Sequence, residues 1–314
     1  MGKAIEHGII FLSTGVLAQT DEGDYRLTGP IIIQRNNEGQ IQETSSNGSI
    51  NIMVQNGARP SVNIFGGSPA PYGKYPQVCQ LITWFDPIDG GQEQGAACSA
   101  SIVNEFTVMT SAHCLQIFPG FTFKNRTVYC GIANSPVITG IVDYYHQFRN
   151  VINTVSHPDF VLTPFSEGIE YDIALLQLEI PLVFNDFVQP IIPWDGVQRV
   201  PEQCATVGFG VTATTNGLGL SPVMREVSIK VRTIARCMSL APPPPVTANN
   251  ICFFNSGPAV ERACGGDSGG PTFCGQYQVG ITTYEYEDCT IKSFGGSMNV
   301  SKFIGWIKEN SFHF

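Results

Sequence analysis

The stretch that decides the fold is GGDSGGP, at Gly265–Pro271. Glycines on both sides of the serine allow tight backbone turns that other residues resist. They also let backbone N–H groups converge on an oxygen that becomes negative during acyl transfer. The serine in such a loop is a candidate nucleophile, but its hydroxyl needs a base to remove the proton. The rest of the chain must therefore supply a histidine and a carboxylate.

Two further short segments supply those groups. His113 lies in TSAHC at Thr110–Cys114, and Asp172 opens DIALL at Asp172–Leu176. Histidine accepts a proton near neutral pH, and a buried carboxylate fixes its tautomer and stabilises the imidazolium. Taken alone, each segment has an ordinary structural explanation, as core or as the start of a strand. All three in the order His, Asp, Ser indicate a serine-nucleophile catalytic apparatus.

Together the three segments resemble the trypsin- and chymotrypsin-like serine proteases, over roughly residues 64–314. The resemblance implies an all-β fold of two packed six-stranded antiparallel β-barrels with a C-terminal α-helix. It implies that His113 is the general base, Asp172 its orienting carboxylate and Ser268 the nucleophile. The N–H groups of Gly266 and Ser268 would form the oxyanion hole. The implied substrate is a protein or peptide.

The serine mechanism needs no cofactor and no metal, so none is expected. Some members of the family bind calcium through carboxylates in a loop of the first barrel. The corresponding stretch, Cys130–Thr139, contains no Asp or Glu. We therefore expect no calcium site there.

The patterning of the chain agrees with an all-β domain from Ile64 onward. Short apolar and β-branched runs are separated by Gly, Pro, Asn and Asp, which is typical of strands and turns. By itself this pattern allows paired barrels or a sandwich. Only Val300–Asn310 predicts a helix, because Phe303, Ile304 and Ile307 share one face beside Trp306. The predicted strands are Gln77–Phe85, Ser99–Thr110, Asn150–Thr154, Asp172–Leu178, Ala205–Val211, Glu226–Val231 and Gln278–Thr283.

Composition indicates a secreted protein. The net charge of −9 argues against nucleic acid or an anionic membrane as partner, because both favour clustered Lys and Arg. The 10 cysteines suggest a disulfide framework. Asn-x-Ser/Thr sites at Asn47, Asn125 and Asn299 suit a glycoprotein on the secretory route. An apolar run ending near Ala18 predicts a signal peptide over residues 1–18, and no later run is long enough to span a bilayer.

The resemblance also implies a set of disulfides. Cys79 and Cys130 have no counterpart among the disulfides of the family. They fall on strands that should be neighbours in the first barrel, so we predict an additional bridge between them. The family pairs are Cys98–Cys114, Cys204–Cys274, Cys237–Cys252 and Cys264–Cys289.

Residues 19–63 are predicted to be a pro-segment, followed by the protease domain at 64–314. In the family a zymogen is cut before a run like Ile64-Phe65-Gly66-Gly67, and the new amino group pairs with the Asp before the nucleophile, here Asp267. Asn63 precedes Ile64, so a trypsin-like activator would find no suitable bond. Either an activating protease of non-tryptic specificity makes the cut, or the chain is not activated in this way.

The pro-segment differs in character from the domain. It is polar, contains no cysteine, and places turn signals around the apolar runs Ile31–Ile33 and Ile50–Val54. The sequence is compatible with a small hairpin pair or with a loosely ordered segment. Without a cysteine, the segment could leave once it is cut.

The implied specificity pocket departs from the family pattern. Arg262 stands six positions before the nucleophile, at the pocket floor, and a guanidinium there suggests cleavage after Asp or Glu. Thr283 and Gly295 are also carried over to the pocket. Glu285 stands at the mouth where the family has Gly, so it either reaches in and neutralises Arg262 or turns into solvent.

Several functions therefore stay open. The first is an active secreted endopeptidase, and the second is a protease held latent by its own pocket mouth. The third is a catalytically silent homologue that serves as a binding or regulatory module, and the fourth is a structural extracellular protein. The intact set of His, Asp and Ser disfavours the silent homologue, because a protein released from catalysis has no chemical need for all three groups.

Overall fold

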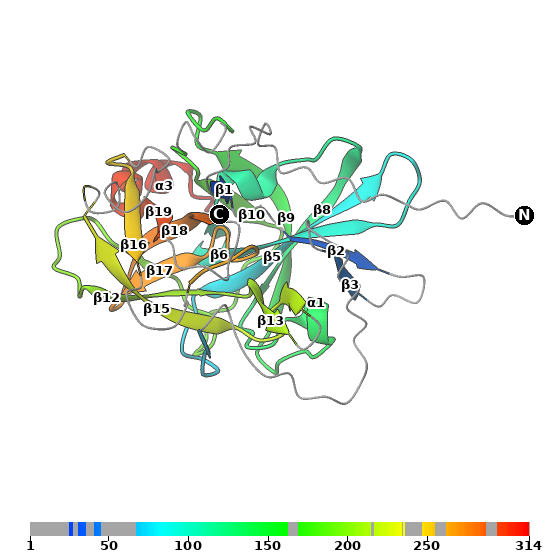
Figure 1. Cartoon of the computed structure of the whole chain (residues 1–314), viewed down its shortest axis with the longest axis horizontal. Coiled ribbons are helices and arrows are strands. Elements are labelled where there is room, and N and C mark those ends of the chain that lie inside the picture. The colour runs from blue at the N-terminus through cyan, green and yellow to red at the C-terminus, as the bar shows by residue number, and fades with distance from the viewer. Residues whose placement is uncertain are drawn as a thin grey trace, which may run out of the picture.

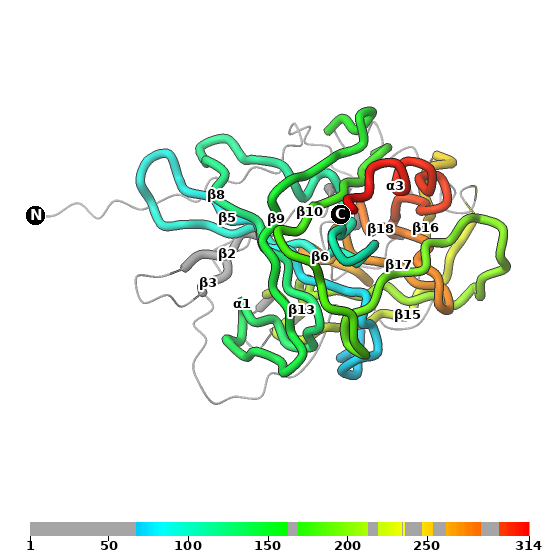
Figure 2. The backbone as a smooth tube through the Cα atoms, turned by 180° about the vertical axis from the view of Figure 1, so that it is seen from behind, coloured from blue at the N-terminus to red at the C-terminus, as the bar shows by residue number. Residues whose placement is uncertain are grey.

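The computed structural model describes residues 67–162, 169–214, 217–233, 235, 247–254, 262–286 and 294–313, and three strands further upstream. Two barrels lie side by side. Figures 1 and 2 show the cyan and green elements of the first barrel on one side and the yellow and orange elements of the second on the other. The predicted two-barrel architecture is confirmed, and the sandwich alternative is excluded.

The first barrel contains six antiparallel strands that follow the order β6-β5-β8-β9-β10-β7, and the pairing of β7 with β6 closes it. Along the chain, the short 3-10 helix η1 (Ala112–Leu115) lies between β7 and β8, and the single-turn helix α1 (Pro136–Thr139) lies between β8 and β9. The strands are β5 (Val78–Pro87), β6 (Gln94–Asn104), β7 (Thr107–Thr110), β8 (Phe121–Cys130), β9 (Gln147–Ser156) and β10 (Ala174–Leu178).

The second barrel also contains six strands, in the order β18-β17-β12-β15-β16-β19, and closes where β19 pairs with β18. β15 shows the expected alternation, since Val227 and Ile229 are buried while Ser228 and Lys230 are exposed. The strands are β12 (Gln203–Gly208), β15 (Arg225–Arg232), β16 (Asn250–Phe254), β17 (Pro271–Cys274), β18 (Tyr277–Tyr286) and β19 (Phe294–Asn299).

Short elements extend these barrels. β4 (Ser68–Pro69) pairs with β15, β11 (Ile192–Pro193) pairs in parallel with β18, and β13 (Val211–Thr214) forms a hairpin with β14 (Gly217–Leu220). Upstream, β1 (Tyr25–Leu27) pairs with β18, while β2 (Ile31–Arg35) and β3 (Ile41–Thr44) form a hairpin that pairs with β6. Of the two alternatives for residues 19–63, the described strands therefore match the hairpin. The second apolar run, Ile50–Val54, lies outside the described residues.

Several strand predictions had wrong bounds. The run Ser99–Thr110 is two strands, because a turn at Glu105 and Phe106 separates β6 from β7. Ala205–Val211 likewise spans the end of β12 and the start of β13. β8 was not among the predicted strand runs, although Cys130 at its end was expected to lie on a strand; its outer half, Phe121–Asn125, is mostly exposed. This half is a strand because it pairs with β5, and not because its own residues favour strand structure.

One hydrophobic core is shared by both barrels. Met109 and Leu175 from the first barrel belong to the same buried cluster as Val207 and Ile281 from the second. The C-terminal segment closes this core. It is a 3-10 turn, η3 (Val300–Lys302), followed by helix α3 (Ile304–Asn310), and Phe303 and Ile307 are both 3% exposed. The predicted C-terminal helix and its buried face are confirmed.

The structure contains three of the expected disulfides, Cys79–Cys130, Cys98–Cys114 and Cys204–Cys274. Cys252 and Cys264 are also disulfide-bonded. Cys237 and Cys289, the partners that the resemblance gives them, lie outside the described residues. Cys79 and Cys130 are directly opposite each other on β5 and β8, which explains how two cysteines without a family counterpart can be bridged.

Removing that additional bridge should cost stability. We expect the double variant Cys79→Ala, Cys130→Ala to lose about 4 kcal/mol of unfolding free energy, because the bridge closes a loop with a sequence separation of 51 in the unfolded chain. Denaturant unfolding of the oxidised full chain measures this loss. A change below about 1 kcal/mol would mean that the unfolded chain is not constrained by this bridge.

Candidate active site

His113 is held by the short 3-10 helix η1 (Ala112–Leu115), which follows directly after β7 and residue Ser111. The Cys98–Cys114 bridge ties this helix to β6. His113 is only 3% exposed, so its ring is placed by packing and not by solvent. In the local sequence TSAHC, the strand β7 thus ends and one helical turn follows. The disulfide of Cys114 fixes the position of the neighbouring His113.

Asp172 is fully buried and faces His113. One carboxylate oxygen accepts the backbone N–H of His113 at 2.8 Å, and the other lies 2.7 Å from His113 Nδ1. With the carboxylate ionised, Nδ1 carries the proton and donates it to Asp172, which leaves Nε2 as the ring's acceptor. This is the tautomer that a general base needs.

Backbone geometry sets the position of Asp172. The preceding residue, Tyr171, has a φ of 56°, the left-handed region that non-glycine residues seldom adopt. The N–H of Ile173 donates to the carbonyl of Tyr171 at 2.8 Å across Asp172, so the chain turns sharply at the aspartate before β10 begins at Ala174. The strand prediction from Asp172 to Leu178 was therefore two residues too long at its start. This turn had no signal in the sequence.

Ser268 lies in a tight loop between Cys264 and β17. Its carbonyl accepts the N–H of Ser99 on β6 at 2.8 Å, and the next residue, Gly269, donates to the carbonyl of Thr282 on β18 at 2.8 Å. The same Thr282 carbonyl accepts the hydroxyl of Ser111 at 2.9 Å. The nucleophile loop and the His113 segment are thus anchored to one carbonyl group. The predicted histidine, aspartate and serine segments come together in space.

Gly266 and Gly269 carry the unusual backbone angles of this loop, with φ values of 88° and 76°. The carbonyl of Gly266 accepts the hydroxyl of Ser99 at 3.2 Å, which fixes the peptide preceding Asp267. A Cβ at Gly269 would overlap the carbonyl of Ser99 and the N–H of Ser111. Both glycines are therefore required by geometry. The assignment of the Gly266 and Ser268 N–H groups to an oxyanion hole stays a prediction.

Asp267, which precedes Ser268, is fully buried. Its carboxylate accepts the N–H of Gly210 at 2.7 Å and the N–H of Cys264 at 3.0 Å. Gly208 and Gly210 leave space for it, because a Cβ at either position would overlap the carboxylate. Sequence analysis missed these two glycines. Ile64, the partner that the resemblance gives to Asp267, lies outside the described residues.

Burial raises the pKa of Asp267 to about 6 from an ordinary value of 3.8, against the opposing effect of its two backbone hydrogen bonds and the charge of Arg225. Arg225 is buried as well, and burial lowers its pKa while Asp267 raises it. A carboxyl group with a raised pKa binds its proton more tightly in the folded than in the unfolded chain. Ionisation of Asp267 therefore lowers the free energy of unfolding, even with the charge of Arg225 acting on it.

This gives a pH prediction for the uncut chain. Unfolding free energy should fall as the pH rises from about 4 to about 6 and stay level above that, with an amplitude on the order of 3 kcal/mol. Other groups titrate in the same range, so the quantity to measure is the difference between the natural chain and Asp267→Asn in denaturant unfolding at each pH. A difference that does not change between pH 4 and 7 would contradict the assignment to Asp267.

The expected pocket residues are buried where they are described. Arg262 is 4% exposed, Thr283 donates its hydroxyl to the carbonyl of Ile281 at 3.0 Å, and Gly295 lies in β19 opposite Phe253. Glu285 has its backbone in β18, opposite Arg26 of β1, but its side chain lies outside the description. The two alternatives for Glu285 therefore stay open.

Within the described residues, one group of potential metal ligands gathers near the site: Cys98, His113 and Cys114. The two cysteines are bonded to each other, so neither offers the thiolate that metals bind. This group is a disulfide packed beside a histidine and not a metal site.

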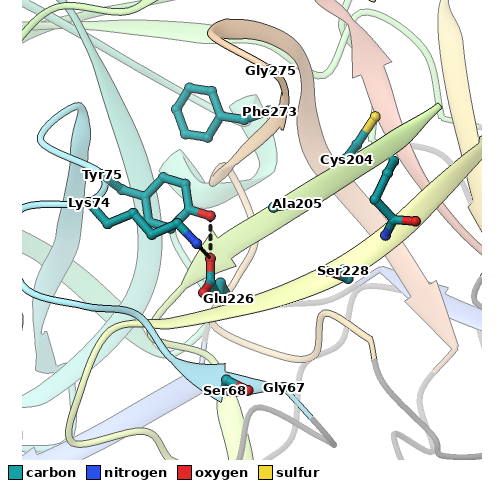
Figure 3. A pocket seen from close by; sticks show the side chains of 11 residues that line it. Gly67, Ser68, Lys74, Tyr75, Cys204, Ala205, Glu226, Ser228, Phe273 and Gly275 are labelled. Carbon is teal, nitrogen blue, oxygen red and sulfur yellow. Dashed lines mark hydrogen bonds and ion pairs between the residues drawn. The ribbon is translucent and has the colours of Figure 1, made fainter. Parts of the chain in front are cut away.

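A cleft of about 480 Å³ lies on a different part of the protein, where β4 meets the second barrel (Figure 3). In Figure 3, Lys74 and Tyr75 both point toward Glu226, whose carboxylate accepts the ammonium of Lys74 at 2.5 Å and the hydroxyl of Tyr75. Burial, followed by the hydrogen bond to Glu226, raises the pKa of Tyr75. None of His113, Asp172 and Ser268 lines this cleft. We interpret it as a surface hollow between the barrel and the start of the domain.

Comparison with known proteins agrees with this geometry. The family model described as Trypsin matches residues 64–307. The chain belongs to the trypsin family. Similar curated proteins are Serine protease 1 of Rattus norvegicus, 29% identical over 215 residues that cover 68% of this chain and 79% of the rat protein, and Trypsin of Phaedon cochleariae, 28% identical over 254 residues that cover 80% and 90%.

The fold comparison points the same way. The solved structure of neuropsin, a serine protease expressed in the limbic system of mouse brain, matches with a TM-score of 0.62 and 21% identity. The match covers 78% of this chain and 99% of neuropsin, and it supports the trypsin-family fold alone. Among the described residues, no helix is long and apolar enough to cross a membrane.

Proposed function

We propose that this trypsin-family protein is a secreted serine endopeptidase made as a zymogen. Under this proposal residues 1–18 are a signal peptide, 19–63 a pro-segment and 64–314 the protease domain. The observation that carries the catalytic part is the pair of contacts from buried Asp172 to His113, at 2.8 Å to the backbone N–H and 2.7 Å to Nδ1. A carboxylate that uses both oxygens on one histidine has the geometry of an orienting group.

The chemistry follows from that arrangement. His113 Nε2 removes the proton from Ser268 Oγ as the oxygen bonds to the substrate carbonyl carbon, and Asp172 stabilises the imidazolium. The carbonyl oxygen becomes an oxyanion and accepts hydrogen bonds from the N–H groups of Gly266 and Ser268, each worth about 3–4 kcal/mol in the transition state. Breaking the C–N bond releases the amine, which takes the proton from His113. Water then repeats the sequence on the acyl ester and frees the carboxylic acid.

Activation would use Asp267. Cleavage between Asn63 and Ile64 creates an α-amino group at Ile64. As an ammonium beside Asp267, this group would form an ion pair with the buried carboxylate, in addition to the charge of Arg225. The two N–H groups that hold Asp267 come from Gly210 and Cys264, so the ion pair would brace the loop that carries Ser268. The activator would need non-tryptic specificity because Asn63 precedes the bond.

Two finer proposals concern the preferred substrate and the site of glycosylation. Arg262, buried six residues before Ser268, would select a carboxylate side chain and so favour cleavage after Asp or Glu.

Asn125 is exposed on β8 and is accessible for glycosylation, whereas Asn299 is half-buried and its side chain accepts the N–H of Ser301 at 3.2 Å. Asn125 is therefore the better acceptor of the two.

The test uses a cleavable chain. Arg59→Asp, Pro60→Asp, Ser61→Asp, Val62→Asp and Asn63→Lys place an enteropeptidase site directly before Ile64. A serine-directed fluorophosphonate is added before and after cutting, with Ser268→Ala as control. Rapid labelling after the cut, absent in Ser268→Ala, supports the proposal. A cut and folded chain that never labels would favour the silent homologue instead.

A further inference from the structure

The pro-segment strands lie on two particular sheet edges. β1 pairs antiparallel with the last three residues of β18, with Leu27 opposite Tyr284 and Tyr25 opposite Tyr286. β2 pairs antiparallel with the first residues of β6, with Ile31 opposite Ala97 and Gln34 opposite Gln94. One short stretch of chain, residues 25–35, therefore adds a strand to each barrel. Figure 1 shows β1 against the second barrel and β2 with β3 beside the first.

Both edges lead directly to the nucleophile loop. On β18, Thr282 is two residues before Tyr284 and its carbonyl accepts the N–H of Gly269 at 2.8 Å. On β6, Ser99 is two residues after Ala97 and its N–H donates to the carbonyl of Ser268 at 2.8 Å. The strand pairings of the pro-segment thus begin just beyond the contacts that hold Ser268, on either side of it.

Chain length limits how the segment connects these edges. Leu27 and Ile31 are four residues apart, so their separation is at most about 14 Å. β1 pairs with β18, the strand that contains Thr282, and β2 pairs with β6, the strand that contains Ser99. The ends of β1 and β2 therefore lie close together, one on each barrel, next to the two residues that anchor the Ser268 loop.

Extended peptides bind proteins by adding a strand to a free sheet edge, so that main-chain hydrogen bonds supply the affinity. We propose that β1 and β2 are an intramolecular ligand that occupies the edges of β18 and β6 next to the Ser268 loop and excludes substrate. This inference rests on the proposed function for its consequence, although the occupancy itself does not depend on catalysis. The β2–β3 hairpin supports the contact, since it continues the sheet of the first barrel outward from β6.

Cleavage changes the strength of this ligand. While the segment is covalently attached, its effective concentration at the edges is of the order of millimolar, as for a short flexible tether. Residues 19–63 contain no cysteine, so cutting at Asn63–Ile64 leaves the segment held by non-covalent contacts alone. Inhibition should then depend on dilution, in contrast to a pro-segment retained by a disulfide.

The first test measures occupancy in the full, uncut chain. Among Gly95–Ala97 and Tyr284–Tyr286, the amides that point toward β2 and β1, and not toward β5 and β19, should exchange slowly. Ile32→Pro or Arg26→Pro should speed exchange at these amides by about tenfold or more, because proline in a strand disrupts pairing. Ile52→Pro makes the same change in the pro-segment outside β1, β2 and β3 and should leave exchange unchanged. Fast exchange at both edges in the natural chain would overturn the proposal.

The second test avoids variants that fail to fold. A synthetic peptide of residues 21–45 is added to the enteropeptidase-cut chain after dilution and removal of the released segment. It should slow fluorophosphonate labelling of Ser268 by about tenfold or more at millimolar concentration, and the Ile32→Pro peptide should be much weaker. Equal inhibition by both peptides, or by neither, would overturn the proposal. If the cut chain never labels, but the peptide slows amide exchange at the edges of β6 and β18, the segment does occupy these edges. That result would count against the proposed function and not against this inference.

Discussion

Asp172→Asn is expected to lower the rate at which the cut chain reacts with fluorophosphonate by about 10⁴-fold, the loss known for this change in a trypsin-type triad. The reason is the contact of 2.7 Å between His113 Nδ1 and the Asp172 carboxylate. An amide in that place can turn its NH₂ toward Nδ1, which makes Nδ1 an acceptor and puts the proton on Nε2. His113 then has no lone pair for the serine proton.

The control for this experiment is Asp159→Asn. Asp159 has 66% of its side chain exposed and lies near a different histidine, His157, so the same loss of charge should leave the labelling rate unchanged. Denaturant unfolding of both variants separates a folding defect from a chemical one. A loss smaller than about tenfold in folded Asp172→Asn would mean that Asp172 does not orient the base.

Gly269→Ala should destabilise the fold by about 2–5 kcal/mol, the combined cost of a left-handed backbone and of overpacking a close contact. Gly269 has a φ of 76°, and a Cβ there would meet the backbone of Ser99 and Ser111 as well as the hydroxyl of Thr110. These groups belong to the elements that carry the active site, so they have little freedom to move. Thermal or denaturant unfolding measures the loss.

Gly90→Ala provides the matched control. Gly90 has a nearly identical φ of 80°, but nothing lies within 4 Å of the position that a Cβ would take. Its cost should be only the backbone contribution, roughly 1–2 kcal/mol. The difference between the two variants isolates the packing of the nucleophile loop against the His113 segment. Equal losses in both would show that this contact can relax.

The parts of the site that could be predicted are those in which chemistry restricts the residue type. His113, Asp172 and Ser268 are surrounded by short motifs whose side chains and glycines have few alternatives. The additional bridge between Cys79 and Cys130 could be predicted because β5 and β8 are neighbours in the barrel. In each case the information is local, or depends only on the order of strands.

The parts that could not be predicted depend on contacts between segments far apart in the sequence. Gly208 ends β12 and Gly210 follows two residues later, and nothing in the sequence shows that the Asp267 carboxylate lies against both of them. Tyr171 takes a left-handed conformation that nothing in its neighbours requires. The pairing of Ile31 with Ala97 follows from an edge that only the folded barrel creates, so the sequence left the hairpin as one of two alternatives.

The shared hydrophobic core has a consequence for how the protein melts. Met109 and Leu175 of one barrel and Val207 and Ile281 of the other are buried in a single cluster, so neither barrel can lose its packing without exposing apolar surface of its neighbour. The two barrels should therefore behave as one cooperative unit and not as two independently melting domains. His113 and Asp172 come from one barrel and Ser268 from the other. Loss of reactivity and the calorimetric transition should consequently coincide on heating.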